Sequence, residues 1–187
     1  MGEDQANLRE ALKRVATGLK QTGVPFALAG GYAAWARGGP EPDHDVDFLV
    51  SPEDCDTVVG LLAEQGLQIV EPPEDWLFKV FTDDAMVDIL QRAGDGSDVR
   101  AALERATEIE VLSVQMPVLA ATDVILQKLA TLGERYCDLG AVLPSARALR
   151  EQVDWDLVRR GVAGNPYAEV TLDLLERLDV VAPSSGT

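Results

Sequence analysis

The chain has 187 residues, a formal net charge of −16 and a hydrophobic share of 47%. This length suits one domain, or a small domain with a helical addition, and it is long enough to bury a substantial core. The excess of acid argues against non-specific binding of nucleic acid over the whole surface, and it favours cationic ligands or basic partners.

Neither a membrane segment nor a secretory signal is expected. No run approaches the roughly 18 unbroken apolar residues of a membrane span. The acidic start of the chain lacks the basic and apolar regions of a signal peptide. Cys55 and Cys137 lie far apart and have no metal-ligand spacing. We therefore expect a cytoplasmic protein with reduced thiols.

The first half of the chain alternates helices and strands. Leucine and valine at helical spacing predict a helix over residues 5–22, which Gly23 ends. An apolar strand over 24–29 then leads into two glycines. A further helix is predicted from Ser51, as its N-cap, to about residue 65.

The following segments are predicted to be rich in strands, and the last third helical. Two β-rich runs, 76–82 and 85–90, flank Asp83-Asp84 and indicate a hairpin. A short strand precedes them at 67–70, and Asp98 is predicted to open a short helix. Residues 108–119 are β-like, with Met116-Pro117 as a break, and only helices are expected from Ala121 onward.

Two motifs in the first half carry candidate chemistry. Gly30-Gly31 ends the apolar strand, and glycines let a backbone approach phosphates, which the free N–H groups of a following helix can bind. Asp45 and Asp47 alternate in the next predicted strand, so their side chains should share a face while Val46 points into the core. Mg²⁺ prefers such oxygen ligands together with substrate phosphates.

Asp88 is the candidate third carboxylate. It stands alone in the apolar strand predicted over 85–90. A carboxylate in such a setting is costly unless a charged group meets it. We therefore expect Asp88 to join Asp45 and Asp47 around one or two metal ions.

The order of an apolar strand, a Gly-Gly turn, Asp-x-Asp and a later Asp resembles the nucleotidyltransferase superfamily, whose palm domain is shared with DNA polymerase β. The resemblance implies an α+β (α/β) fold in which helices flank a mixed β-sheet. It implies a palm domain over residues 1–118 and a C-terminal helical region over 119–187 that packs on it.

The resemblance also implies the site. Asp45, Asp47 and Asp88 would be both catalytic and metal-binding, and Gly30 and Gly31 would bind the nucleotide. The implied cofactor is Mg²⁺, as one or two ions, and the implied substrate is an NTP.

A second cue lies in the helix predicted to be capped by Thr122. Its Lys128, Arg135 and Asp138 resemble a signature of small bacterial nucleotidyltransferases, including the AbiEii and MenT toxins. By that resemblance Lys128 would contact the triphosphate, and Arg135 or Asp138 would shape the nucleotide site.

The loop before Asp45 departs from that branch. Glu41 and Asp43 stand where AbiEii-type proteins usually have an arginine and a hydroxyl residue. The single histidine, His44, is expected to be a loop residue.

The expected reaction transfers a nucleoside monophosphate from an NTP to an acceptor hydroxyl, a transferase reaction of the EC 2.7.7 type. The lead acceptor is the tRNA 3′ end, as in MenT-type toxins, which would imply a cognate antitoxin. An antibiotic of the aminoglycoside or lincosamide type is the alternative, because the acidic chain suits a cation. The third alternative is a catalytically silent nucleotide-binding or interaction protein. The presence of all three carboxylates, Asp45, Asp47 and Asp88, argues against it.

Overall fold

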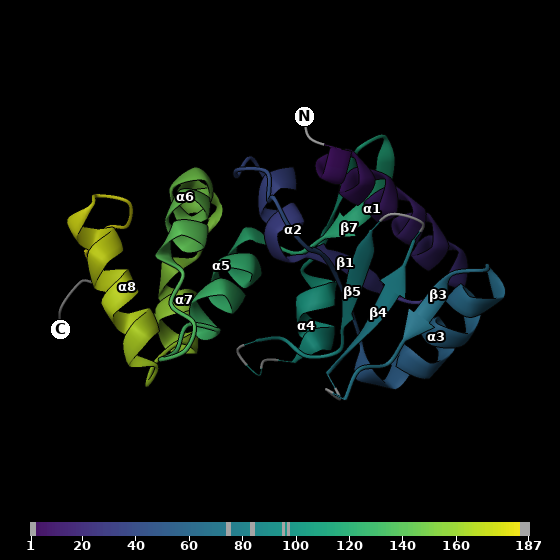
Figure 1. The fold of residues 1–187 in the computed structure, drawn as a ribbon. Coiled ribbons are helices and arrows are strands. Elements are labelled where there is room, and N and C mark those ends of the chain that lie inside the picture. Colours follow the sequence, from purple (N-terminus) through teal and green to yellow (C-terminus); the bar gives the residue numbers. More distant parts are fainter. Residues whose placement is uncertain (1–2, 74–75, 83–84, 95, 97, 184–187) are drawn as a thin grey trace.

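The computed structural model describes residues 3–73, 76–82, 85–94, 96 and 98–183 (Figure 1). Its helices are α1 (Glu3–Thr22), α2 (Gly30–Ala36), α3 (Cys55–Glu64), α4 (Val99–Glu104), α5 (Ala121–Ala130), α6 (Leu139–Leu149), α7 (Trp155–Gly161) and α8 (Pro166–Arg177), with 3₁₀ turns η1 (Pro52–Asp54) and η2 (Arg150–Gln152). Its strands are β1 (Phe26–Ala29), β2 (Val46–Val50), β3 (Gln68–Val70), β4 (Leu77–Phe81), β5 (Met86–Leu90), β6 (Thr107–Val111) and β7 (Val114–Val118).

The strands form one mixed sheet in the order β3-β4-β5-β2-β1-β7-β6. The pairs β2/β5 and β1/β7 are parallel, and the other neighbours are antiparallel. Every residue of β1 is buried, as expected for a central strand covered on both faces. The predicted α+β class is confirmed.

Helix α1 packs across the sheet because its apolar residues recur at helical spacing. Leu12, Val15 and Leu19 are fully buried, and α1 contacts β2, β5, β7 and α3. Gly23 follows the helix with a left-handed φ of 72°, a conformation that suits glycine. The predicted first helix and its end are confirmed.

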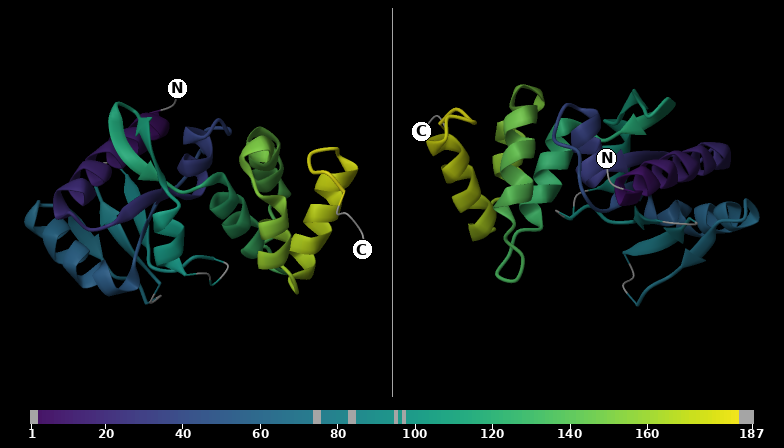
Figure 2. Two further views of the ribbon diagram at one scale, coloured as in Figure 1. Left: turned by 180° about the vertical axis from the view of Figure 1, so that it is seen from behind. Right: turned by 45° about the horizontal axis from the view of Figure 1, so that its top comes forward.

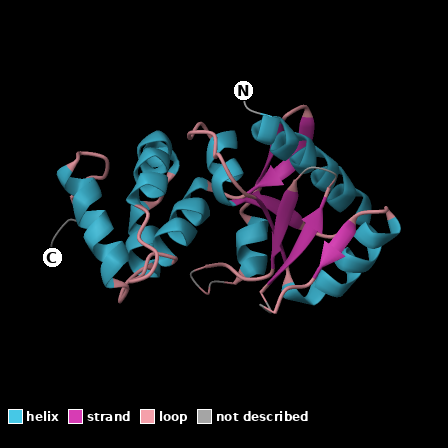
Figure 3. Ribbon diagram, in the orientation of Figure 1, coloured by secondary structure: helices cyan, strands magenta, loops and turns pink. Residues whose placement is uncertain are grey.

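The helices after β7 form a region beside the sheet. All strands lie in one part of the described molecule, and α6, α7 and α8 lie away from them with α5 in between (Figures 2 and 3). Helix α5 contacts α2 as well as α6, α7 and α8. The predicted domain boundary at 118/119 stays a prediction. No helix in the described ranges is long and apolar enough to cross a bilayer.

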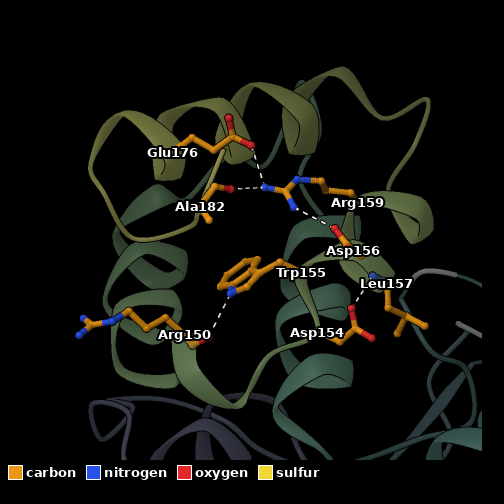
Figure 4. A network of polar contacts seen from close by, with 8 residues as sticks. All are labelled: Arg150, Asp154, Trp155, Asp156, Leu157, Arg159, Glu176 and Ala182. Atoms are coloured by element: carbon orange, nitrogen blue, oxygen red, sulfur yellow. Dashed lines mark hydrogen bonds and ion pairs between the residues drawn. The ribbon is translucent and has the colours of Figure 1, made fainter. Parts of the chain in front are cut away.

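An arginine ties the last two helices to the segment that follows α8 (Figure 4). The guanidinium of Arg159 donates to Glu176 Oε1 at 2.8 Å and to the carbonyl of Ala182 at 2.7 Å. The indole of Trp155 donates to the carbonyl of Arg150 at 3.0 Å. These bonds fix α7 against α8 and against the turn that precedes α7.

Three local predictions need correction. Ser51 is the N-cap residue of the 3₁₀ turn η1, which leads into α3, but its side chain accepts no capping hydrogen bond. Pro117 does not break the strand: it lies within β7 opposite Glu108. Thr122 is not the cap of α5, which begins after Ala120; its hydroxyl accepts instead from the backbone N–H of Asp154 at 2.9 Å. The predicted hairpin is confirmed as β4 and β5, although its turn residues lie outside the described part of the chain.

One ion pair anchors α5 to the end of α4. Arg105 donates to both carboxylate oxygens of Asp123, at 3.1 and 2.6 Å. The Asp123 side chain is 2% exposed, whereas that of Arg105 is 47% exposed. Because only the carboxylate is fully buried, the two partners should differ in what their loss costs.

We predict that Arg105→Met destabilises the protein by about 3 kcal/mol, since it leaves a buried charge without its guanidinium. Asp123→Asn should cost only about 1 kcal/mol, since the half-exposed arginine can be solvated. Urea unfolding of both variants measures the difference. Equal losses, or a larger loss in Asp123→Asn, would show that burial of the carboxylate does not dominate.

Candidate active site

The Gly30-Gly31 turn is built for two close approaches. Gly30 has a φ of +57°, and a Cβ placed on it would lie 1.9 Å from Oδ2 of Asp47. A Cβ on Gly31 would lie 2.9 Å from Cβ of Pro42. The first glycine therefore lets the carboxylate of Asp47 rest against the main chain, and the second lets the loop before β2 pack on α2.

The sheet register sets Asp47 and Asp88 side by side. Asp47 in β2 is the direct partner of Asp88 in the parallel strand β5, so both side chains lie on the same face. Asp47 is also the partner of Ala29, the last residue before the glycine turn. The predicted proximity of these two carboxylates to each other and to the turn is thus observed.

Asp45 is arranged differently from the prediction. It precedes β2 rather than lying in it, and its φ is +53°. This left-handed conformation is uncommon outside glycine, although Asp tolerates it better than most residues. The side chain is exposed, so regular strand alternation does not place it beside Asp47. The charge of Asp45 nevertheless acts on Asp47 and raises its pKa.

Lys79 is a site residue that the sequence reasoning missed. Its Nζ donates to Oδ1 of Asp88 at 2.9 Å from the neighbouring strand β4, where the two residues are direct partners. The expected hairpin could have revealed it, because pairing 76–82 with 85–90 sets one lysine opposite one aspartate. Lys79 meets the charge on Asp88 that the apolar strand alone would leave unpaired.

Asp47 is poised between its charged and neutral forms. Burial, together with the carboxylates of Asp88 and Asp45, raises its pKa to about 7, and the lysines Lys128 and Lys79 oppose that rise. Burial lowers the pKa of Lys128, which Asp47 and Asp138 counteract. The centre of the site therefore has more negative charge than its lysines balance.

The three carboxylates and Lys128 line a cavity of about 970 Å³, and Lys79 lies outside its lining. It is bounded by the glycine turn, the loop before β2, residues of β2 and β5, the segments next to β4 and β5, and helices α5 and α6. Trp76 and Tyr136, both exposed, contribute aromatic surface, and Arg92 contributes a cation. The cavity lies within the size range of small-ligand pockets. All the predicted site residues except Arg135 line it: Gly30, Gly31, Asp45, Asp47, Asp88, Lys128 and Asp138.

The helix predicted to carry Lys128, Arg135 and Asp138 is broken in two. Helix α5 ends at Ala130, and α6 begins at Leu139. Asp138 is the N-cap of α6 and accepts from the backbone N–H of Ala141 at 3.2 Å. Arg135 is exposed in the connection. Lys128 and Asp138 thus face the cavity from separate elements, and a role of Arg135 in nucleotide binding stays a prediction.

The donor set suits a hard cation. Carboxylate oxygens are the ligands that Mg²⁺ prefers. The pKa of Asp47 is raised first by burial and then by the carboxylates of Asp88 and Asp45, whose charge a cation would balance. Among the described residues, no group of three His, Cys, Asp or Glu side chains has the spacing to hold an ion by itself. One oxygen of Asp88 is already bonded to Lys79. The residues therefore fit Mg²⁺ if substrate phosphates complete its coordination.

We predict that, in metal-free buffer, Asp47→Asn stabilises the protein at pH 8 by up to about 4 kcal/mol. The folded-state pKa is raised, so ionised Asp47 destabilises the fold fully above pH 7 and not at all near pH 4. The advantage of the variant should therefore shrink as the pH falls to 5. Urea unfolding at both pH values measures it, and an advantage independent of pH would contradict the assigned cause.

Comparisons with solved structures identify other chains of the same fold. The solution structure of the antibiotic-resistance factor ANT(2″)-Ia superposes with a TM-score of 0.64 at 14% identity, covering 93% of this chain and 99% of that one. The crystal structure of ANT(2″)-Ia in complex with adenylyl-2″-tobramycin gives 0.61 at 13% identity, covering 88% and 99%. A nucleotidyltransferase-like protein from Paracoccidioides brasiliensis gives 0.55 at 12% identity, covering 91% and 88%.

At these identities the structural likeness shows the fold alone. No curated protein sequence matches the chain. The sequence model of one family, described as "Uncharacterised nucleotidyltransferase", matches residues 1–181. Because that match spans nearly the whole chain, the protein belongs to this nucleotidyltransferase family.

Proposed function

We propose that this nucleotidyltransferase transfers a nucleoside monophosphate from an NTP to a hydroxyl of a small cationic acceptor, with Mg²⁺ as cofactor. The observation that carries the proposal is the convergence of Asp47, Asp88 and Lys128 on one cavity beside the glycine turn. A carboxylate pair and a lysine from a separate helix supply metal-binding, proton-accepting and phosphate-binding groups at one place.

Asp45 and Asp47 would hold Mg²⁺, with Asp88 beside them. When bound, the ion neutralises phosphate oxygens and stabilises the charge that develops during in-line displacement. Gly30 keeps the Asp47 carboxylate at the mouth of the turn, because no side chain stands between them.

Lys128 would bind the departing end of the triphosphate. It is partly buried on α5, and the negative charge of Asp47 favours its protonated form. A partly desolvated ammonium interacts with phosphate more strongly than one in open water. Lys128 would therefore stabilise the pyrophosphate as it leaves.

Asp88 would accept the proton of the acceptor hydroxyl. The acceptor oxygen forms a bond to the α-phosphorus, the bond to pyrophosphate breaks, and the hydroxyl proton passes to the carboxylate. Lys79 donates to Oδ1 of Asp88 at 2.9 Å, and Oδ2 would take the proton. The lysine thereby orients the base.

The acidic wall of the cavity favours a cationic acceptor over RNA. Besides the central carboxylates, Asp43 and Asp138 line it, whereas the charge of Glu41 is paired with Arg9. Such a wall attracts amines and repels phosphodiesters. The complex of ANT(2″)-Ia with adenylyl-2″-tobramycin, a chain of the same fold, is consistent with this order. The cavity thus favours the alternative that the sequence ranked second.

The tRNA 3′ end is the second candidate. Arg135, Arg147 and Arg160 are exposed in the helical region, where they could contact a phosphate backbone. A toxin role and an antitoxin partner would follow only if RNA is the acceptor.

The glycine turn provides the first test of the proposal. Gly30→Ala should lower kcat by at least about 100-fold, because the new Cβ would displace the carboxylate of Asp47. Gly60→Ala is the matched control: it lies in α3, and its Cβ would meet nothing within 4 Å. That control should keep full activity, and equal activity in the two variants would contradict the role of the Gly30–Asp47 contact.

The acceptor requires a separate assay. The protein is incubated with Mg²⁺ and each of the four α-labelled NTPs in turn, once with a panel of hydroxylated polyamines such as aminoglycosides and once with total RNA. We expect label in the small-molecule fraction, because the wall is acidic. Label in RNA, falling steeply as salt rises, would replace the small cation with the tRNA candidate. Label in neither fraction would contradict both acceptors.

A further inference from the structure

The loop between α2 and β2 forms one wall of the cavity. Its residues 40–45 all line the cavity, and it ends at Asp45 in a left-handed conformation. Two of its residues, Pro40 and Pro42, are prolines, which limits the conformations it can adopt. The position of this loop therefore decides where Asp45 stands.

Helix α1, which lies far from this loop in the sequence, holds the loop through an ion pair. Arg9 of α1 donates through Nε to Oε1 of Glu41 at 2.7 Å and through Nη2 to Oε2 at 2.5 Å. Such two-bonded contact fixes orientation as well as distance, because the guanidinium is a planar fork. The side chains of Arg9 and Glu41 are only 27% and 17% exposed, so the pair is better shielded than an ordinary surface pair.

The aromatic side chains of α2 pack next to Arg9. The guanidinium of Arg9 lies 5.6 Å from the ring centroid of Trp35. Trp35 in turn meets Tyr32 edge to face, with ring centroids 5.7 Å apart. Both aromatics belong to α2, the helix that the glycine turn opens. The arginine thus joins α1, α2 and the loop at one point.

We propose that Arg9 is a positioning residue of the active site: its two-bonded pair with Glu41 fixes the loop over residues 40–45 and thereby sets Asp45 for metal binding. The inference rests on the proposed function for the role of Asp45. Two contacts hold the loop: the ion pair of Glu41 with Arg9, and the packing of Pro42 on Gly31. Arg9 itself does not line the cavity, so it acts through Glu41.

The test compares Arg9→Gln, Arg9→Lys and Glu41→Gln with the control Lys13→Gln, which breaks an exposed ion pair with Glu10 on the same helix. In Arg9→Gln, the Mg²⁺ concentration for half-maximal rate should rise by about tenfold, the range typical of lost outer partners of metal ligands. The KM for NTP should change little. Arg9→Lys keeps the charge without the fork and should fall between wild type and Arg9→Gln.

Amide hydrogen exchange separates this inference from the proposed function. In Arg9→Gln and Glu41→Gln, the backbone amides of residues 41 and 43–45 should exchange faster, and in Lys13→Gln they should not. This readout needs no activity, so it decides the positioning role even for an acceptor of another kind. A lower melting temperature with unchanged exchange in 41–45 and unchanged Mg²⁺ dependence would reduce the pair to a structural contact and overturn the inference.

Discussion

The arrangement of the site depends on the carboxylate of Asp47 resting directly on the main chain at Gly30. A side chain at Gly30 would occupy the place of Oδ2, and the sheet register sets Asp88 immediately beside Asp47. Burial, together with the like charges of Asp88 and Asp45, raises the pKa of this carboxylate to about 7. A site strained in this way binds a cation favourably, because the cation relieves the repulsion.

The rest of the fold brings the compensating groups to that point. Strand β4 brings Lys79 to Asp88, and α5 brings Lys128 to the other side of the cavity. Helix α5 is held in place by the ion pair between the buried Asp123 and the half-exposed Arg105. The sheet therefore supplies Asp47, Asp88 and Lys79, and α5 supplies Lys128.

The sequence predicts the parts of the site that follow from strand periodicity. The glycine turn, Asp47 and Asp88 could be found because each stands out against an apolar strand, and strand pairing then brings them together. The left-handed backbone conformation of Asp45 could not be predicted, since it depends on the packing of the preceding loop. The break between α5 and α6 was missed because helical spacing continues through residues that tertiary structure holds in a loop.

Long-range side-chain pairs were the hardest to foresee. Arg9 and Glu41 lie 32 residues apart, and no local pattern connects them. Lys79 was nearer to prediction, because the hairpin that places it opposite Asp88 was itself expected. The composition shows the excess of acidic residues. Only the structure shows that the loop before β2 and the start of α6 bring some of them to one cavity, where they bear on the choice of acceptor.

The most direct measurement is calorimetric titration of the protein with a non-hydrolysable NTP analogue, with and without Mg²⁺, in the wild type and in Asp45→Ala. The account predicts Mg²⁺-dependent binding to the wild type and loss of the Mg²⁺-dependent part in the variant. Binding that does not respond to Mg²⁺, or is unchanged in Asp45→Ala, would contradict a carboxylate-held metal at the centre of this site.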